Sequence, residues 1–408
     1  MRRLDLQEWQ RSEAVRLTLA EREALRRGLP SLGIEPATDS EHAWLLTPAE
    51  TVGALEVGGL SVSIRPKLDV GRVLFLASYA MGAFKLREAE RFSFPDADTL
   101  VEGLARVFAA SARRAFSRGL VHGYRTQEEA LHTVRGRIRF ADQMRRRFGI
   151  PTPVEVRYDD FTEDVLPNRL VRRAAERLGR MRIRSPSSRA DLAWIDGTLE
   201  NVALVAYPRH AVPEVVFNRL NEHYREVVAL ARLVLRHATI ETGRGAVRAP
   251  GFLMDMNRVF QEFVTRALRE SLGLSDRAFR SDSGVRGVTL DEASRVRLRP
   301  DLSWWDGPTC RFVGDAKYKR VQDGHVPNAD LYQLLAYATA LDLPGGLLVY
   351  AQGETPEAVH VVRHAGRRLE VAALDLSGTI DDLRRRIRRL AERVRRLRDE
   401  GPTARRVA

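Results

Sequence analysis

The stretch RLRPDLSWWDGPTCRFVGDAKYKR (297–320) carries the pattern that decides the fold of the second half of the chain. Two strand-like segments flank a turn-forming Asp-Gly pair at 306–307. Asp301 follows a proline at the end of the first segment, and Asp315 ends the apolar run of the second. If the two strands form a hairpin, the two carboxylates lie side by side. Lys317 comes two residues after Asp315, so the two side chains project from the same face of a strand.

This group of side chains is suited to phosphoryl chemistry. Two carboxylates are hard oxygen ligands that can hold Mg²⁺, whose remaining positions are usually filled by water and substrate phosphate. Such an ion polarises a phosphoryl oxygen and lowers the pKa of a bound water, which then attacks. Lys317 could orient or deprotonate that water, or stabilise the charge that develops on phosphorus. The alternative is a solvated strand end at which Asp315 and Lys317 only pair with each other.

The helix expected at 328–341 favours the catalytic interpretation. It carries Gln333 and Tyr337, which lie four residues apart and therefore on one helical face. Further along, GLLVYA (346–351) reads as a buried strand, and a strand pair is expected near 358–374. A final arginine-rich helix should begin near Thr379. This helix could pack on its own domain, dock a partner or contact nucleic acid.

The first half of the chain alternates between strand and helix patterns. A hairpin is expected at 52–65 around Gly58-Gly59, and helices are expected at 71–84 and 99–118. The segment 131–140 reads as a strand pair broken at Gly136. Further helices are expected at 165–181, 189–203, 213–238 and 254–272. The Gly-, Arg- and Pro-rich segment 241–251 between the last two is the candidate linker, which divides the chain into regions 1–242 and 243–408.

Composition narrows the class of protein. At about 150 residues per domain, 408 residues predict two or three domains. The net charge of +13 favours a polyanionic partner such as nucleic acid. The single cysteine excludes an internal disulfide framework, and no apolar run is long enough to cross a bilayer, so we expect a cytoplasmic protein with no membrane association. Only four residues are lysines, Lys67, Lys85, Lys317 and Lys319, and the last two lie two residues apart within the segment 297–320.

Residues 297–337 resemble the PD-(D/E)xK nuclease superfamily, including the Gln-x-x-x-Tyr helix of its RecB-like branch. Most of the chain is similar to the McrC family, the nuclease subunits of McrBC-type restriction systems. That wider similarity rests on SIRPKLDVGRVLFLASYA (63–80), VRGRIRF (134–140), TEDVLPNRLVRRA (162–174) and MNRVFQEFV (256–264).

The resemblance implies a role for each site residue. Asp301, Asp315 and Ala316 would bind Mg²⁺, Ala316 having only main-chain atoms to offer. Lys317 would be the catalytic lysine, and Gln333 and Tyr337 would border the site and help to place the scissile strand.

The resemblance also implies an α+β amino-terminal region (1–242) that docks an AAA+ GTPase of the McrB type and stimulates it. An α/β restriction-endonuclease-like domain (243–408) would follow. The reaction would be Mg²⁺-dependent hydrolysis of double-stranded, modified DNA that leaves a 5′-phosphate. GTP would be bound by the partner, because the chain lacks the phosphate-binding Gly-Lys-Ser/Thr motif.

One residue departs from the family pattern. The first nuclease helix usually carries a glutamate where this chain has Gln261, and Glu262 follows one position later, turned away from the apolar stripe. Gln261 could still offer a carbonyl oxygen to a metal. Two alternatives to a McrC-like subunit therefore stay open: a stand-alone DNA nuclease for repair or recombination, and a non-catalytic assembly subunit.

Overall fold

The computed structural model describes residues 2–38, 42–91, 94, 97–148, 150–240, 250–281, 287–321, 326–353 and 358–400. Most of the candidate linker, 241–249, lies outside these ranges. The chain forms two compact units, one made of 1–100 together with 239–408 and the other of 101–238. Within the described residues, no helix is both long and apolar enough to span a membrane.

The amino-terminal part of the first unit is built on two small sheets. The five-stranded sheet has the order β1-β6-β5-β11-β10, and the three-stranded sheet has the order β2-β4-β3. The expected hairpin is confirmed, because β5 and β6 pair antiparallel around Gly58 and Gly59, which both adopt positive φ (57° and 79°) as a tight hairpin turn requires. The strands are β1 (Arg2–Gln7), β2 (Val15–Arg16), β3 (Leu32–Pro36), β4 (Ala43–Pro48), β5 (Thr51–Val57), β6 (Leu60–Arg65), β10 (Ala238–Ile240) and β11 (Pro250–Asp255).

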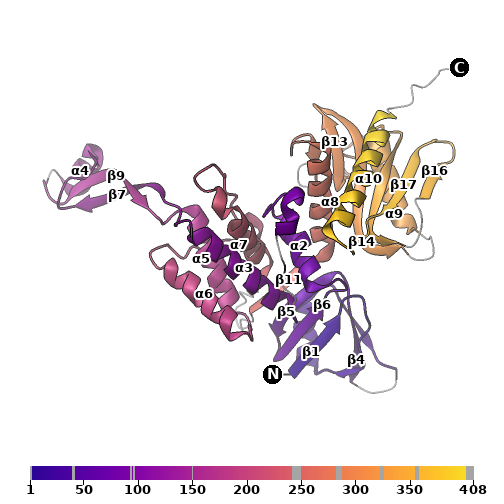
Figure 1. The fold of residues 1–408 in the computed structure, drawn as a ribbon, viewed down its shortest axis with the longest axis horizontal. Helices are drawn as coiled ribbons and strands as arrows, with labels where there is room; N and C mark the ends of the chain where they lie inside the picture. The colour runs from indigo at the N-terminus through magenta and orange to yellow at the C-terminus, as the bar shows by residue number, and fades with distance from the viewer. Residues whose placement is uncertain are drawn as a thin grey trace. The chain divides into compact units, whose positions relative to one another are not determined.

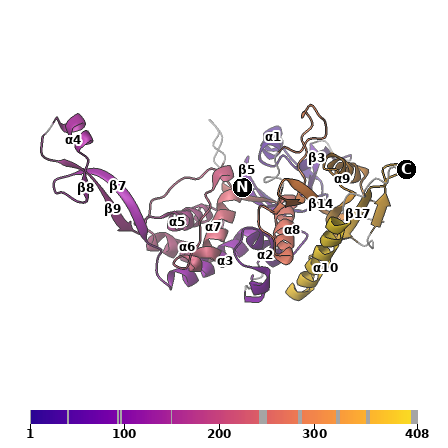
Figure 2. The same ribbon diagram turned by 90° about the horizontal axis from the view of Figure 1, so that it is seen from above.

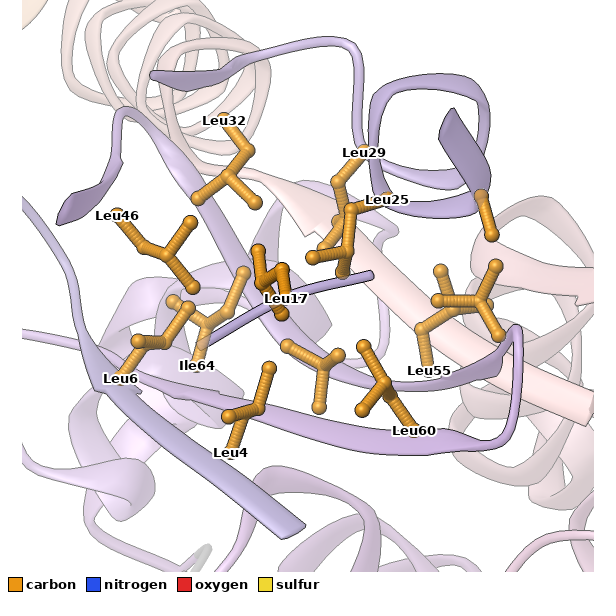
Figure 3. Close-up of a cluster of buried hydrophobic side chains, with 13 residues drawn as sticks. Leu4, Leu6, Leu17, Leu25, Leu29, Leu32, Leu46, Leu55, Leu60 and Ile64 are labelled. Atoms are coloured by element: carbon orange, nitrogen blue, oxygen red, sulfur yellow. The ribbon is translucent and has the colours of Figure 1, made fainter. Parts of the chain in front are cut away.

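A leucine-rich core joins these sheets to helix α1 (Leu19–Gly28). Alternate residues of β1, such as Leu4 and Leu6, belong to the same buried cluster as Leu25 and Leu29 from the helix region (Figure 3). The helix begins at a capping box in which Thr18 and Glu21 bind each other's backbone N–H groups. This core is independent of the residues that the sequence analysis placed in the candidate site.

The chain returns to this sheet with β10 and β11. Strand β11 pairs antiparallel with β5, from Gly251 opposite Leu55 to Asp255 opposite Thr51. The sequence analysis placed the regional boundary at 242, whereas the structure groups the first hundred residues with the carboxy-terminal half. Pairing between strands almost two hundred residues apart leaves no local pattern in the sequence. Helix α2 (Val70–Ala80) and the short 3₁₀ helix η1 (Leu86–Arg91) follow β6 in the chain.

The second unit is a helical bundle that carries a long β-ribbon. Its helices are α3 (Leu100–Phe116), α5 (Leu166–Gly179), α6 (Pro186–Thr198) and α7 (Arg225–His237), with 3₁₀ turns η2 (Arg209–Ala211) and η3 (Glu222–Tyr224). Helix α7 begins twelve residues later than expected. The side chains of Asn218 and Asn221 bind nearby backbone N–H groups there, which competes with helix formation.

The ribbon contains β7 (Gly123–Leu131), β8 (Arg137–Ile138) and β9 (Val154–Thr162), and helix α4 (Phe140–Arg147) lies at its far end (Figure 2). The expectation of a strand pair within 131–140 is wrong. Strands β7 and β8 do not pair with each other, because β9 lies between them and pairs antiparallel with both. The long-range partner β9 was not visible from the local pattern around Gly136.

The carboxy-terminal half of the chain is a six-stranded mixed sheet covered by helices, in the order β12-β13-β14-β15-β17-β16. Helices α8 and α10 pack against each other and on β14, and α9 packs on β14, β15 and β17 from the other face (Figures 1 and 2). The strands are β12 (Phe279–Arg280), β13 (Leu302–Asp306), β14 (Thr309–Val321), β15 (Gly345–Gly353), β16 (Ala358–Val361) and β17 (Arg368–Ala373). The helices are α8 (Met256–Leu272), α9 (Asn328–Ala340) and α10 (Ile380–Asp399).

The arginine-rich helix α10 packs on its own domain. It begins at a capping box formed by Thr379 and Asp382, and its apolar stripe, which includes Leu383, Ile387 and Val394, is buried. Of the three interpretations of this helix, packing on its own domain is therefore confirmed.

Candidate active site

The hairpin of β13 and β14 brings the two predicted carboxylates together. Leu302 pairs with Gly314, so Asp301 and Asp315 stand opposite each other at the next position of the antiparallel pair. Asp315 is buried, with a side chain only 1% exposed. Asp301 is tied to the same place through the Ala316 N–H, which donates to its Oδ2 at 3.1 Å. The predicted convergence of the two strand ends is confirmed.

Lys317 completes this group from the same face of β14. Its Nζ lies 2.5 Å from Asp315 Oδ2. Lys317 is less buried than Asp315, with 24% of its side chain exposed, so its ammonium group lies between the buried carboxylate and solvent. This pair is not the solvated strand end of the alternative interpretation, because the carboxylate is removed from water.

Helix α9 supplies the third side of the site. Gln333 Oε1 accepts a hydrogen bond from Lys317 Nζ at 3.0 Å, and Gln333 Nε2 donates to Tyr337 Oη at 2.6 Å. Tyr337 in turn donates to the main-chain oxygen of Arg299 at 3.0 Å, two residues before Asp301. The structure therefore brings together the predicted residues of α9, β13 and β14 in one hydrogen-bonded chain.

Helix α8 contacts Asp301 through Gln261, the residue that departs from the family pattern. Gln261 Nε2 donates to Asp301 Oδ1. Thr265, one turn further on, donates through Oγ1 to the main-chain oxygens of Gln261 at 2.8 Å and Asp301 at 3.4 Å. Glu262 instead pairs with Arg258 on its own helix at 3.1 Å. Gln261, and not Glu262, is thus the α8 side chain that reaches the site.

The other face of β14 is fixed by residues that the sequence analysis did not assign to the site. The pairing of β14 with β15 shifts register between Lys317 and Arg320. Within this irregularity the Tyr318 N–H donates to Asn257 Oδ1 at 3.2 Å. The Tyr318 ring is fully buried, and Lys67 Nζ lies 4.1 Å from its centroid. These contacts hold the backbone next to Lys317.

Burial and like charge set the electrostatics of the site. Burial, reinforced by the negative charge of Asp315, raises the pKa of Asp301 to about 8. Burial also raises the pKa of Asp315, although Lys317 acts in the opposite direction. Burial alone would lower the pKa of Lys317, but the carboxylates of Asp315, Asp301 and Asp330 together outweigh it, so the pKa of Lys317 is raised and its ammonium form is favoured. A cation bound between two buried carboxylates would relieve their mutual repulsion and so would be stabilised there.

The donor set fits a divalent metal ion of the magnesium type. Asp315 Oδ1 is buried and has no hydrogen-bond partner among the described residues. The carboxylates are hard oxygen donors, and the main chain of Ala316 adjoins them. In the ranges that the structure describes, no group of three or more His, Cys, Asp and Glu side chains could hold a metal. Mg²⁺ suits such a small set, because it usually keeps several waters.

Asp330, which meets Lys319 beside the site, and Tyr350 had no role assigned to them from the sequence. Lys319 Nζ lies 2.7 Å from Asp330 Oδ2, and Tyr350 Oη donates to the same oxygen at 2.5 Å. The spacing of Asp330, Gln333 and Tyr337 along the chain, three and four residues, could have shown that they share a face of α9. Asn257 had no comparable signal, because its role depends on where α8 packs.

The chain matches the family model described as the McrBC 5-methylcytosine restriction system component, over residues 46–351. A relative from Escherichia coli (strain K12), the type IV methyl-directed restriction enzyme EcoKMcrBC, is 22% identical over an alignment of 320 residues that covers 71% of this chain and 88% of that protein.

The fold is also similar to a solved structure from Thermococcus gammatolerans, described as a refined half-complex from a tetradecameric assembly of McrB AAA+ hexamers with bound McrC. The TM-score is 0.57 at 19% identity, and the match covers 96% of this chain and 100% of that chain. The family match spans both the amino-terminal hairpin and the Asp301–Lys317 site. The chain therefore belongs to the family of McrBC 5-methylcytosine restriction system components, which confirms its assignment to the McrC family.

Proposed function

We propose that this protein is the DNA endonuclease subunit of a McrBC-type restriction system and has a PD-(D/E)xK catalytic site. The observation that carries the proposal is the group formed by Asp301, Asp315 and Lys317. Two carboxylates stand opposite each other on neighbouring strands, and a lysine with a raised pKa bridges one of them to Gln333. This arrangement has the charges that phosphodiester hydrolysis requires.

Each residue would have a distinct role in the reaction. Asp301 and Asp315, with the Ala316 main chain, would hold Mg²⁺, which when bound polarises the phosphoryl oxygen and activates water. Lys317 would donate hydrogen bonds to the phosphate as negative charge develops on it. Gln333 would keep the Lys317 ammonium in place. Tyr337, anchored on the Arg299 carbonyl, would fix the orientation of the Gln333 amide.

Metal binding can be tested without activity. Mg²⁺ should raise the midpoint of thermal unfolding of the wild type. The free energy of unfolding should increase by about 1.4 kcal/mol when the free ion is about tenfold above its Kd. Asp315→Asn should lose this shift because it removes a carboxylate ligand. Asp306→Asn, an exposed carboxylate at the hairpin turn, is the matched control and should keep it. An unchanged shift in Asp315→Asn would place the metal elsewhere.

The partner would be an AAA+ GTPase of the McrB type. The similar Thermococcus gammatolerans structure is described as McrB AAA+ hexamers with bound McrC, and the present chain lacks a nucleotide-binding motif of its own. We infer that the β-ribbon of the second unit takes part in docking. The far end of the ribbon exposes large apolar side chains of a kind that monomeric proteins usually bury: Phe140, Met144, Phe148 and Ile150.

Removing this apolar surface should weaken the partner's response. Phe148 is 88% exposed, so Phe148→Ser should leave the fold intact while reducing stimulation of the GTPase rate, by roughly tenfold if the side chain contributes about 1.4 kcal/mol to docking. Val216→Ser changes a side chain that is 87% exposed outside the ribbon and should leave stimulation unchanged. Equal stimulation by wild type and Phe148→Ser would remove this residue from the docking surface.

Cleavage of plasmid DNA in Mg²⁺, with and without the AAA+ partner and GTP, tests the proposed function. Cutting of modified plasmid that requires both partner and GTP is the expected result. Cutting without them would favour the stand-alone nuclease. If no condition gave cleavage but the chain still raised the GTPase rate, the chain would be a non-catalytic assembly subunit.

A further inference from the structure

Two lysines of β14 reach the same helix in the same way. Lys317 Nζ contacts Gln333 at 3.0 Å, and Lys319 Nζ contacts Asp330 at 2.7 Å. Gln333 and Asp330 are three residues apart on α9 and therefore neighbours on its surface. The sequence DAKYK thus presents two cationic groups to one side of the site, although only the first belongs to the catalytic group described above.

The partner of Lys319 is rigidly held. Asp330 is buried in the first turn of α9, and its Oδ2 also accepts a hydrogen bond from the hydroxyl of Tyr350. Tyr350 is fully buried on β15 and stands opposite Lys317 in the parallel pair. Asp330 is therefore fixed both by its own helix and by the central sheet, and it can hold the end of the Lys319 side chain in one place.

Lys319 nevertheless remains accessible. Its side chain is 37% exposed, compared with 24% for Lys317, whereas the Asp330 side chain is only 9% exposed. An ammonium group has three N–H donors, and one ion pair leaves others for a second anion. A buried carboxylate that holds a half-exposed lysine is an arrangement suited to presenting the positive charge outwards.

We propose that Lys319 binds the DNA phosphate next to the scissile one on the same strand, with Asp330 as its positioning residue. This inference rests on the proposed nuclease function. Residues two apart on a strand are separated by about 6.6 Å, which is comparable to the spacing of successive phosphates along a DNA strand. Lys317 at the scissile phosphate therefore places Lys319 near its neighbour. The contact fixes the register of the strand and carries no base specificity.

The test uses two variants that break the same ion pair but change the charge in opposite directions. Lys319→Met removes the cation, and Asp330→Asn removes the anion while leaving an oxygen that can accept from Tyr350. Affinity for a DNA duplex is measured against salt concentration for the full chain in an Asp315→Asn background, which prevents cutting. Lys85→Met, which removes an exposed lysine outside the site, is the matched control.

Lys319→Met should make the plot of log affinity against log salt concentration less steep by about one unit. Its affinity for DNA at 0.1 M salt should fall about eightfold. Asp330→Asn keeps the cation and should keep the slope of the parent, but it should bind DNA more weakly because Lys319 is no longer held in place. Lys85→Met should keep both the slope and the affinity. An unchanged slope in Lys319→Met, or an unchanged affinity in Asp330→Asn, would overturn the proposal. A parent chain that does not bind DNA and, with Asp315 restored, does not cut it in the presence of the AAA+ partner and GTP would instead overturn the proposed function.

Discussion

Replacing Lys317 by methionine should reduce DNA cleavage by between about 100- and 10,000-fold. The ammonium group lies 2.5 Å from Asp315 and 3.0 Å from Gln333, so it is held where charge on the phosphate would develop. Methionine has a similar length but no charge and no N–H donor. The loss should therefore appear in kcat.

Two measurements separate this effect from misfolding. The Mg²⁺-induced shift of the unfolding midpoint should persist in Lys317→Met, because both carboxylates remain. Lys85→Met removes an exposed lysine and should cut DNA like the wild type. Cleavage by Lys317→Met within a few-fold of the wild-type rate would show that this lysine has no catalytic role.

The second large effect concerns Glu370, a fully buried carboxylate on β17. Its Oε2 pairs with Arg393 of α10 at 2.5 Å, and Arg393 is itself only 4% exposed. Glu370→Ala should destabilise the carboxy-terminal domain by about 3–5 kcal/mol, because it leaves the charge of Arg393 buried without its carboxylate. The expected result is a large fall in the midpoint of thermal or urea unfolding.

The matched control removes an exposed partner of the same carboxylate. Arg396 lies 3.5 Å from Glu370 Oε2, but its side chain is 57% exposed. Arg396→Ala should cost less than about 1 kcal/mol, since exposed ion pairs contribute little. Comparable losses from Glu370→Ala and Arg396→Ala would mean that burial of the Glu370–Arg393 pair does not govern the attachment of α10.

Those parts of the fold that depend on local pattern could be predicted from the sequence. The Asp-Gly turn and its flanking apolar residues predicted the β13–β14 hairpin, and hence the opposition of Asp301 and Asp315. The alternation of side chains along a strand placed Lys317 beside Asp315. The four-residue spacing of Gln333 and Tyr337 placed them on one face of α9, and the structure shows that this face meets Lys317.

Features that depend on distant partners could not be predicted in this way. Strand β11 completes the amino-terminal sheet, and β9 separates β7 from β8, yet neither pairing has a local signature. The contact of Asn257 with the Tyr318 N–H arises from a register shift in β14 together with the packing of α8. The spacing of Asp330 from Gln333 and Tyr337 is visible in the sequence, but its contact with Lys319 becomes apparent only in the structure.

The most direct test of the central claim is Mg²⁺-dependent cleavage of modified plasmid by wild type and Asp315→Asn, each with the AAA+ partner and GTP. The wild type should produce double-strand breaks with 5′-phosphate ends, and Asp315→Asn should produce none while still stimulating the GTPase. Equal cleavage by both proteins would contradict the assignment of the catalytic site to the β13–β14 hairpin.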